Sequence, residues 1–163
     1  MRHLCKLLFI VLMVVFPYKS FYGEAYTVKS SSGREHKYRL ERLKEKHKEL
    51  MIEAIIYHES RFRTYAYKED ENAAGVLQIR PIMVREANKI VGYEKYTLDD
   101  RWDREKSIEL FWDVQNYHNP KMILEDVCHY WNSGQAGRKN WKATEMYRQE
   151  VSLIYNRLLA SEV

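Results

Sequence analysis

The sequence predicts a mostly helical, single-domain globule with at most a small strand element. Apolar residues recur at spacings of three and four in several windows, as one face of an α-helix requires. No window shows sustained alternation of apolar and polar residues, the pattern of a half-buried strand, and no internal repeat is present. With 163 residues the chain is long enough for one compact domain with its own core.

Residues 1–25 are predicted to be a signal peptide. Arg2 and Lys6 precede a run of ten apolar residues, which is shorter than the roughly 20 needed to cross a bilayer. Gly23 and Ala25 put small residues where a signal peptidase reads, so cleavage is expected after Ala25. The alternative is an uncleaved N-terminal anchor, because the preceding segment is bulkier than usual. We therefore expect an exported protein of the periplasm or cell envelope, attached to the membrane only if this segment is retained.

The domain is expected over residues 36–163, after a flexible lead-in over residues 26–35 that has a Ser-Ser-Ser-Gly run and no apolar periodicity. A first helix is predicted over residues 36–58. Its early part carries Lys, Arg and Glu at helical spacings, which is typical of a solvated face with local ion pairs. A polar cluster between Arg61 and Gly75 predicts a loop or a small hairpin, and a small strand element is expected near residues 76–79.

Proline, glycine and capping residues mark the later helices. Pro81 is well placed as the first residue of a helix that stops at Gly92, and Asp103 can cap a third helix that runs to about Tyr117. Asn119 and Pro120 repeat the cap-and-proline signal and predict a fourth helix that ends before Gly134. A last helix is predicted from about Asn140 to Leu159. The expected core-facing residues are Ile82, Ala87, Ile90 and Val91 in the second helix and Met146, Tyr147, Val151, Ile154, Tyr155 and Leu158 in the last.

Charge and cysteine content argue against several classes of function. The formal net charge is +4, and setting aside three cations and one carboxylate in the leader leaves +2, so nucleic acid is not an expected partner. Only Cys128 remains outside the leader, which rules out a disulfide within the mature chain. Cys5 precedes the apolar run, whereas a lipoprotein cysteine would follow it. The histidines show no metal-ligand spacing, and neither a metal nor a cofactor is expected.

Glu59 is the strongest candidate for chemistry. Ile52, Ile55 and Ile56 are spaced for one helix face, and Glu59 follows at steps of three and four on the same face. The carboxyl group therefore lies at the end of an apolar stripe. Burial disfavours the ionised form and raises the pKa of the carboxyl, so this glutamate can hold a proton near neutral pH and deliver it to a leaving group. These are the properties of a glycosidase acid.

The residues that follow Glu59 form a longer pattern. Glu59-Ser60 is followed by the aromatic Phe62 and then by Gly-Val-Leu-Gln-Ile-Arg-Pro at residues 75–81. This arrangement resembles the lysozyme-like lytic transglycosylases of the SLT type, which have a glutamate-serine pair, an aromatic residue and a Gly-Leu-Met-Gln-Ile-x-Pro segment. The resemblance implies a lysozyme-like fold of the α+β kind, with the helices dominant.

The resemblance extends over about a hundred residues, which makes it far more specific than one short motif. Residues 103–108 resemble the Asp-Pro-x-x-Asn-Ile helix start of the family, and Trp-Asn-Ser-Gly at residues 131–134 resembles its Tyr-Asn-Ala-Gly. Tyr147 with Val151 resembles its late Tyr-Val-x-x-Val. Arg63-Thr64 and Lys68 depart from the family pattern, which concerns the walls of the groove more than its acid.

The resemblance implies cleavage of the β-1,4 bond between N-acetylmuramic acid and N-acetylglucosamine in peptidoglycan. Most glycosidases use two carboxylates, whereas this family is understood to use one glutamate as acid and then as base. Glu59 takes that role, and a hydroxyl of the muramic acid attacks to leave a 1,6-anhydro end. Peptidoglycan strands are the expected partner, and a secretion or conjugation apparatus is a candidate partner.

The family motifs also imply residues that bind substrate. The positions are Ser60, Gly75, Gln78, Trp131, Asn132 and Tyr147. The Gln78 amide can donate to and accept from sugar groups, and Gly75 would let the backbone approach the sugar or the catalytic helix. Asn132 is equally a residue at the end of a helix before Gly134. Trp131 suits sugar stacking or a partly buried site.

Tyr147 and the acids near residue 70 carry the remaining alternatives. Tyr147 matches a tyrosine that hydrogen-bonds to the catalytic glutamate, although a tyrosine on a buried stripe is more often core. If Asp70 or Glu71 reached Glu59 across a water-sized gap, the product would be that of a goose-type hydrolytic muramidase. A catalytically degenerate peptidoglycan-binding module is the alternative from another class. His58 lies about 100° round the helix from Glu59 and is expected to face elsewhere.

Overall fold

A computed structural model describes residues 33–137 and 139–162. The predicted signal peptide, its cleavage site and most of the predicted lead-in lie outside these residues. None of the helices described here is both long enough and apolar enough to cross a membrane. Residues 38–163 fall in one compact unit, which contains all the features analysed below.

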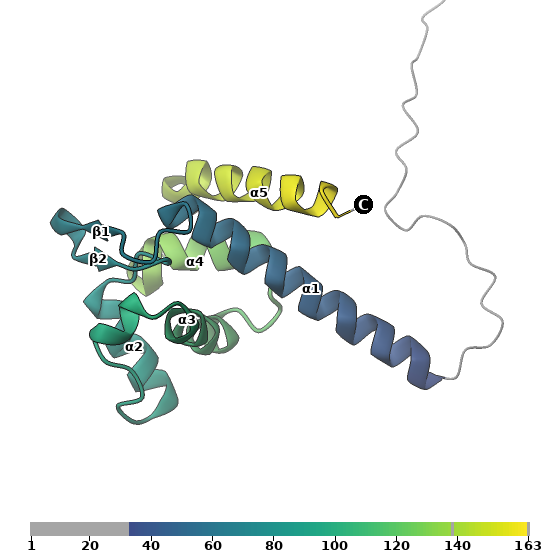
Figure 1. Ribbon diagram of the computed structural model, residues 1–163, viewed down its shortest axis with the longest axis horizontal. Helices are drawn as coiled ribbons and strands as arrows, with labels where there is room; N and C mark the ends of the chain where they lie inside the picture. Colours follow the sequence, from purple (N-terminus) through teal and green to yellow (C-terminus); the bar gives the residue numbers. More distant parts are fainter. Residues whose placement is uncertain (1–32, 138, 163) are drawn as a thin grey trace, which may run out of the picture. The chain divides into compact units, whose positions relative to one another are not determined.

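Five α-helices and one two-stranded antiparallel sheet make up the described part of the chain (Figure 1). The helices are α1 (Gly33–Ser60), α2 (Pro81–Val91), α3 (Arg104–His118), α4 (Leu124–Gly137) and α5 (Glu145–Ala160). The strands are β1 (Tyr67–Lys68) and β2 (Ala73–Ala74), and the 3-10 helices are η1 (Glu69–Glu71), η2 (Asp99–Trp102) and η3 (Trp141–Thr144). The predicted mostly helical class is confirmed.

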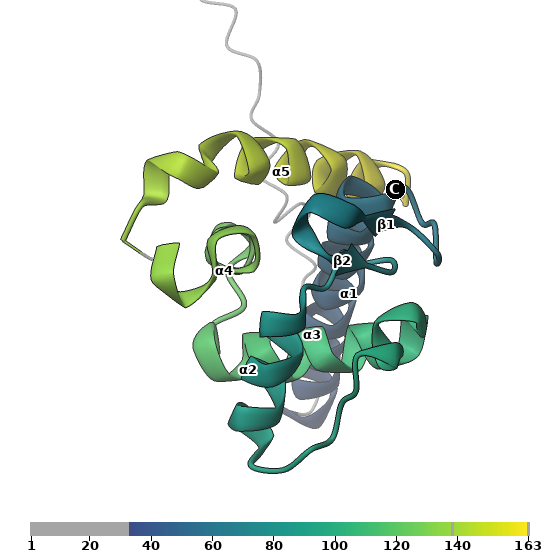
Figure 2. The ribbon, with the colours of Figure 1, turned by 90° about the vertical axis from the view of Figure 1, so that its left-hand side faces the viewer.

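A short hairpin follows α1 directly, as the polar cluster after Arg61 predicted. Tyr67 pairs with Ala74 and Lys68 with Ala73, and η1 forms the turn between the two strands. The strand element expected at residues 76–79 is reduced to a single bridge between Ala74 and Ile79. Figures 1 and 2 show the hairpin at the C-terminal end of α1.

The second half of α1 forms the centre of the core. The predicted stripe is confirmed, because Ile52 is 5% exposed and Ile55 and Ile56 are fully buried. Met51 and Ala54 are also fully buried, so this part of the helix is covered on several sides. Packing supplies the cover: α5 lies on one side of α1 and α2 with α3 on the other (Figures 1 and 2). Each fully buried isoleucine contributes about 1.5–3 kcal/mol.

Three predicted helix boundaries are confirmed by their capping groups. Pro81 is the first residue of α2, and Gly92 ends it with φ +85° and an N–H bond to the carbonyl of Asn88. The Asp103 carboxylate accepts from the backbone N–H of Lys106 at 2.8 Å, at the start of α3. These ends follow from local chemistry that the sequence displays.

The predicted start of the fourth helix is wrong. Asn119 ends α3 instead, with its backbone N–H donating into the last turn at 2.7 Å. Pro120 lies in a turn, Met122 has φ +51°, and α4 begins only at Leu124. The helix also continues past Gly134, where φ of 62° and ψ of −170° interrupt its regular geometry. The cap-and-proline signal was ambiguous because the same residues can close one helix or open the next.

Two residues predicted to face the core are exposed. Ile82 is 57% and Met146 71% exposed. The buried residues of α2 are Met83, Val84 and the predicted Ala87, and the predicted Ile90 packs partly buried against the core. The face of α5 is confirmed apart from Met146: its buried residues are Tyr147 and Val151, with Ile154, Tyr155 and Leu158 partly buried. The helix periods were right, but Ile82 and Met146, each in the first turn of its helix, lie outside the buried face.

Arg101 of η2 fastens the hairpin to the rest of the domain. Its side chain is buried and donates to the carbonyls of Asn72 at 2.9 Å, Ile79 at 3.3 Å and Leu98 at 2.8 Å. A Cβ atom on Gly75, which has φ +78°, would lie 1.7 Å from the carbonyl oxygen of Arg101. The close approach at Gly75 is therefore to η2.

Substitution of Gly75 by alanine should destabilise the domain strongly. The new Cβ collides with backbone and the residue is held at positive φ, so we expect a loss of about 2–4 kcal/mol in the free energy of unfolding. Gly92→Ala is the matched control, since Gly92 also has positive φ but no atom within 4 Å of its Cβ position; its expected cost is only about 1–2 kcal/mol. Urea denaturation compares the two, and equal losses would show that the contact with η2 does not matter.

Candidate active site

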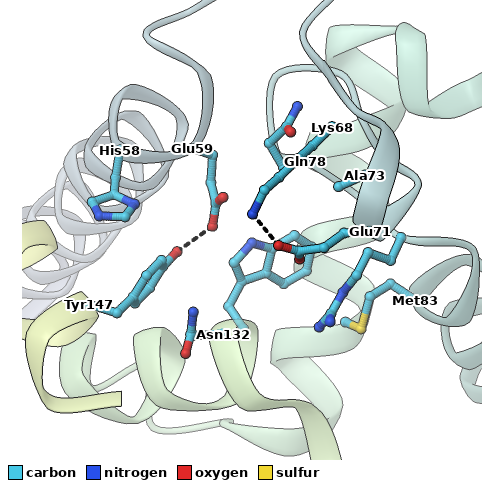
Figure 3. A pocket seen from close by; sticks show the side chains of 11 residues that line it. His58, Glu59, Lys68, Glu71, Ala73, Gln78, Met83, Asn132 and Tyr147 are labelled. Atoms are coloured by element: carbon cyan, nitrogen blue, oxygen red, sulfur yellow. Dashed lines mark hydrogen bonds and ion pairs between the residues drawn. The ribbon is translucent and has the colours of Figure 1, made fainter. Parts of the chain in front are cut away.

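A cavity of about 390 Å³ opens where the last turn of α1 meets the hairpin, α2, α4 and α5. Figure 3 shows the side chains that line it. They are His58, Glu59, Lys68, Glu71, Ala73, Gln78, Arg80, Met83, Trp131, Asn132 and Tyr147. Four of the predicted site residues besides Glu59 therefore meet here, although more than 80 residues separate some of them in the sequence.

Glu59 occupies the penultimate position of α1, directly after the buried isoleucine stripe. Its Oε1 accepts a hydrogen bond from the Tyr147 hydroxyl at 2.6 Å, and the two side chains point toward one another in Figure 3. Burial raises the pKa of the Glu59 carboxyl above its ordinary value, an effect that Tyr147, His58 and Arg80 oppose and Glu71 reinforces. Burial is the largest of these effects, so the net shift of the Glu59 pKa is upward.

Tyr147 is the predicted partner of Glu59, and the contact is present. The residue belongs to the first turn of α5 and is 8% exposed. Burial and the neighbouring Glu59 carboxyl raise the pKa of the Tyr147 phenol well above its ordinary value. The hydroxyl therefore stays protonated and serves as a donor to the carboxyl.

His58 also lines the cavity, so the expectation that it faces elsewhere is wrong. Its Nε2 lies 2.8 Å from Oε2 of Glu150, and its ring centroid is 4.6 Å from that of Tyr147 in an edge-on arrangement. Because the cavity wraps round the end of α1, two neighbouring positions of the helix both border it. His58 thereby supports the ring of Tyr147.

Gln78 lines the cavity as predicted, but its amide nitrogen is already engaged. The backbone of Gln78 has φ +47°. Its Nε2 donates to the carbonyls of Ala66 at 3.0 Å and Gly75 at 2.9 Å. The amide thus braces the hairpin, and the side-chain oxygen is the atom left to face a ligand.

Ser60 and Gly75 are buried and are not among the residues that line the cavity. The Ser60 hydroxyl donates back to the carbonyl of Ile56 at 3.2 Å, one turn earlier in α1. Gly75 packs against η2. Their positions support structural roles, and the predicted contacts of these two residues with substrate are not supported.

Trp131 and Asn132 contribute from α4. Trp131 is only 6% exposed and packs its ring 4.8 Å from that of Phe111, so it forms part of the core and of the cavity wall at once. Asn132 is exposed and borders the cavity, two residues before the irregular Gly134. Asn132 therefore lines the cavity just before the interruption in α4, and its contact with substrate stays a prediction.

The structure places Asp70 and Glu71 differently with respect to the cavity. Glu71 lines the cavity and forms an ion pair with Lys68, the last residue of β1. Asp70 is exposed and does not line the cavity; its carboxylate accepts from the backbone N–H of Glu71 at 3.1 Å. Only Glu71 is placed to take part in chemistry with Glu59.

A second hollow adjoins the first and shares Glu59, Lys68 and Gln78 with it. Its other lining residues are Arg63, Thr64, Tyr65, Ala66 and Tyr67, with the Tyr65 side chain 82% exposed. Glu59 therefore borders both hollows. The sequence does not predict that Tyr65 and Tyr67 border this hollow, because nothing local shows that the residues after α1 fold back alongside Glu59.

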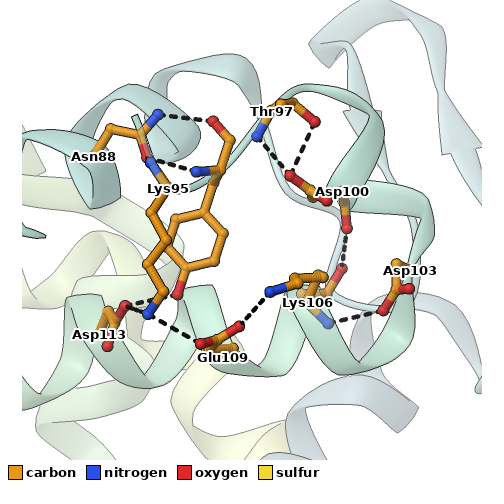
Figure 4. A network of polar contacts seen from close by, with 10 residues as sticks. Asn88, Lys95, Thr97, Asp100, Asp103, Lys106, Glu109 and Asp113 are labelled. Atoms are coloured by element: carbon orange, nitrogen blue, oxygen red, sulfur yellow. Dashed lines mark hydrogen bonds and ion pairs between the residues drawn. The ribbon is translucent and has the colours of Figure 1, made fainter. Parts of the chain in front are cut away.

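A network of polar groups fixes the segment between α2 and α3 (Figure 4). Lys95 Nζ lies 2.7 Å from Asp113 and 3.0 Å from Glu109, and the Tyr96 hydroxyl donates to Asp113 at 2.6 Å. The Asn88 side chain accepts from the backbone N–H groups of Lys95 and Tyr96. These bonds tie the segment to both helices and so hold η2, whose Arg101 secures the hairpin wall.

No group of three or more His, Cys, Asp or Glu side chains in residues 33–137 and 139–162 is arranged to hold a metal ion. Burial raises the pKa of the Cys128 thiol to about 12, so it remains protonated and is a poor nucleophile.

Replacement of Glu59 by glutamine should stabilise the protein above the ordinary carboxyl pKa. A carboxyl whose pKa is higher in the folded than in the unfolded state stabilises the fold at low pH and loses that contribution as the pH rises through the folded-state value. Glutamine cannot ionise, yet its oxygen can still accept from Tyr147. We therefore expect Glu59→Gln to have the higher melting temperature at neutral pH and the difference to vanish near pH 3.

Thermal unfolding followed by circular dichroism over about pH 3 to 8 checks this linkage. Glu49→Gln is the control, because Glu49 is an exposed residue of the same helix and its change should leave the melting temperature nearly constant. A wild-type protein that is more stable than Glu59→Gln at neutral pH would contradict the assignment of a raised pKa.

Comparison with known proteins gives one family. A model described as the transglycosylase SLT domain matches residues 38–153, which include the whole cavity lining. No curated protein and no solved structure gives a match. The match covers most of the chain, and Glu59, Gln78 and Tyr147, which meet in one cavity, all lie within it. The protein therefore belongs to the transglycosylase SLT domain family.

Proposed function

We propose that this protein is a lytic transglycosylase that cleaves the β-1,4 bond between N-acetylmuramic acid and N-acetylglucosamine. Family membership supports cleavage of peptidoglycan in general. The observation that supports the finer proposal is the hydrogen bond from the Tyr147 hydroxyl to the Glu59 carboxyl at 2.6 Å. This carboxyl has a raised pKa and borders two adjoining hollows.

In the first step, protonated Glu59 donates its proton to the oxygen of the glycosidic bond as that bond breaks. The positive charge that develops at the sugar ring is short-lived, and the ionised Glu59 carboxylate is then beside it. In the second step the carboxylate removes the proton from the C6 hydroxyl of the muramic acid, whose oxygen bonds to C1. The products are a 1,6-anhydro end and a free N-acetylglucosamine end, and Glu59 is protonated again.

Tyr147 supports both states of this cycle. Its hydroxyl donates to the carboxylate and limits the rise in pKa caused by burial. Without that donor the buried carboxylate would be poorly stabilised after the first proton transfer. The edge-on contact with His58 and the anchoring of His58 by Glu150 keep the phenol in place.

The hydrolytic muramidase remains the second candidate because Glu71 lines the same cavity as Glu59. A carboxylate that positions a water would convert the reaction to hydrolysis with inversion. The ion pair between Glu71 and Lys68 argues against this role, since it engages the carboxylate. A degenerate binding module is disfavoured because Glu59 retains its hydrogen-bonded partner.

The cellular setting follows from the substrate. Peptidoglycan lies in the cell envelope, so we propose an exported protein that acts there, consistent with the predicted signal peptide. Attachment to a secretion or conjugation apparatus stays a prediction.

Glu59→Gln should abolish cleavage of purified peptidoglycan, because the amide has no proton to give. Asp70→Asn is the control: it removes an exposed carboxylate outside the cavity and should leave the rate nearly unchanged. Mass spectrometry of the wild-type products should show ends lighter by one water than ordinary reducing ends. Activity retained in Glu59→Gln would sink the proposal.

Ordinary reducing ends would instead assign the muramidase reaction. In that case Glu71→Gln should be inactive as well, since it would lose the group that positions water. Anhydro ends together with an active Glu71→Gln variant would establish the single-carboxylate mechanism.

Tyr147→Phe should move the alkaline limb of the pH profile of kcat/KM to higher pH. The limb reports the loss of the Glu59 proton in the free enzyme, and removing the Tyr147 donor raises the pKa of Glu59 further. The cost in stability should be about 0.5–1.5 kcal/mol. Tyr155→Phe is the matched control on the same helix, because the Tyr155 hydroxyl lies 2.8 Å from His47 and does not line the cavity. A limb that stays in place in Tyr147→Phe would make the tyrosine a core residue only.

A further inference from the structure

Arg80 is a cation of the cavity that has no hydrogen-bonded or ion-paired partner in the part of the chain that the structure describes. It lines the same cavity as Glu59, and its positive charge acts on the Glu59 carboxyl. Among residues 33–137 and 139–162, its guanidinium makes no ion pair or hydrogen bond. A partly buried guanidinium without an anion is costly, which makes an external partner informative.

The other basic residues around the two hollows are already engaged. Lys68 pairs with Glu71, and Arg63 Nε donates to the carbonyl of Ser60 at 2.9 Å. Arg80 thus differs from its neighbours in being free to bind a ligand. Figure 3 shows Lys68 and Glu71 directed toward each other at the hairpin wall of the cavity.

The backbone holds Arg80 firmly in place. The residue precedes Pro81, the first residue of α2, and its carbonyl accepts from the N–H of Met83 at 2.9 Å. Its side chain makes no capping bond to α2. The main chain of Arg80 is therefore fixed, while its guanidinium makes no bond to α2 and can bind a ligand. A fixed main chain lowers the entropy cost of binding.

Arg80 also acts electrostatically on Glu59. A nearby cation lowers the pKa of Glu59 and so works against the protonated form that the reaction needs. An anion bound to Arg80 would cancel this effect. Occupation of the guanidinium would therefore favour protonated Glu59 at the moment when substrate is present.

We propose that Arg80 binds a carboxylate of the glycan substrate through its two-pronged guanidinium. The inference rests on the proposed function. Guanidinium and carboxylate groups match in shape and form paired, charge-assisted hydrogen bonds. Muramic acid offers such a group in two ways: as the free lactyl carboxylate of a strand without peptides, or as a carboxylate of the attached peptide.

The test measures binding in a Glu59→Gln background, so that strands are not cleaved during the measurement. The ligands are soluble glycan strands with peptides and strands stripped of peptides, each in its free form and after carbodiimide coupling to methylamine. Coupling converts each carboxylate to a neutral amide of similar size. Isothermal titration then gives the ratio of Kd for the amide and free forms.

We expect the free form to bind about 10-fold or more tightly than the amide form, the range for hydrogen bonds to charged groups. Adding Arg80→Gln should reduce the ratio to about 1, and Arg80→Lys should leave an intermediate ratio because it keeps the charge but loses the fork. Arg85→Gln is the matched control: Arg85 is an exposed residue of α2 outside both hollows and should preserve the full ratio.

Three results would overturn the inference: equal binding of free and amide forms in the parent, a ratio that survives Arg80→Gln, or an equal fall of the ratio in Arg85→Gln. The pair of strands that shows the ratio identifies the source of the carboxylate as lactyl or peptide. If the parent binds neither form of either strand, the proposed function itself fails, which is a different outcome from equal binding of both forms.

Discussion

The burial of the second half of α1 is the constraint on which the site depends, because it carries an ionisable group to the edge of the core. Ile52, Ile55 and Ile56 are almost completely buried, and their helix face continues to Glu59. Hydrophobic packing therefore fixes the position of the carboxyl and also removes it from water. Burial of the apolar stripe stabilises the fold, and burial also raises the pKa of Glu59 by removing its carboxyl group from water. The free energy gained by packing the apolar residues offsets the cost of placing an ionisable group there.

The site is completed by chain segments that meet only after folding. Tyr147 from α5 supplies the hydrogen bond, and its donation moderates the effect of burial on the pKa of Glu59. Burial alone would keep the proton on Glu59, whereas the second half of the proposed reaction needs an ionised carboxylate. A buried acid with one phenolic donor can serve in both states.

A buried arginine, Arg101, holds the hairpin wall. Arg101 bonds three carbonyls of the hairpin and of the segment before η2, and Gly75 allows the backbones to approach closely. Arg80, at the start of the next helix, contrasts with it in having no partner in the described part of the chain. The Arg101 guanidinium is buried and hydrogen-bonded within the fold, whereas the Arg80 guanidinium is available to a ligand.

The sequence by itself determined the helical class, the apolar stripe that leads to Glu59 and several helix ends, because those depend on local periods and caps. The stripe leading to Glu59, the Pro81 start, the Gly92 stop and the Asp103 cap could all be read directly. Only the tertiary structure decided the rotation of α2 that exposes Ile82, the late start of α4, and the meeting of His58, Glu71 and Arg80 around Glu59. These features depend on contacts between segments far apart in the chain, for which spacing along the sequence carries no information.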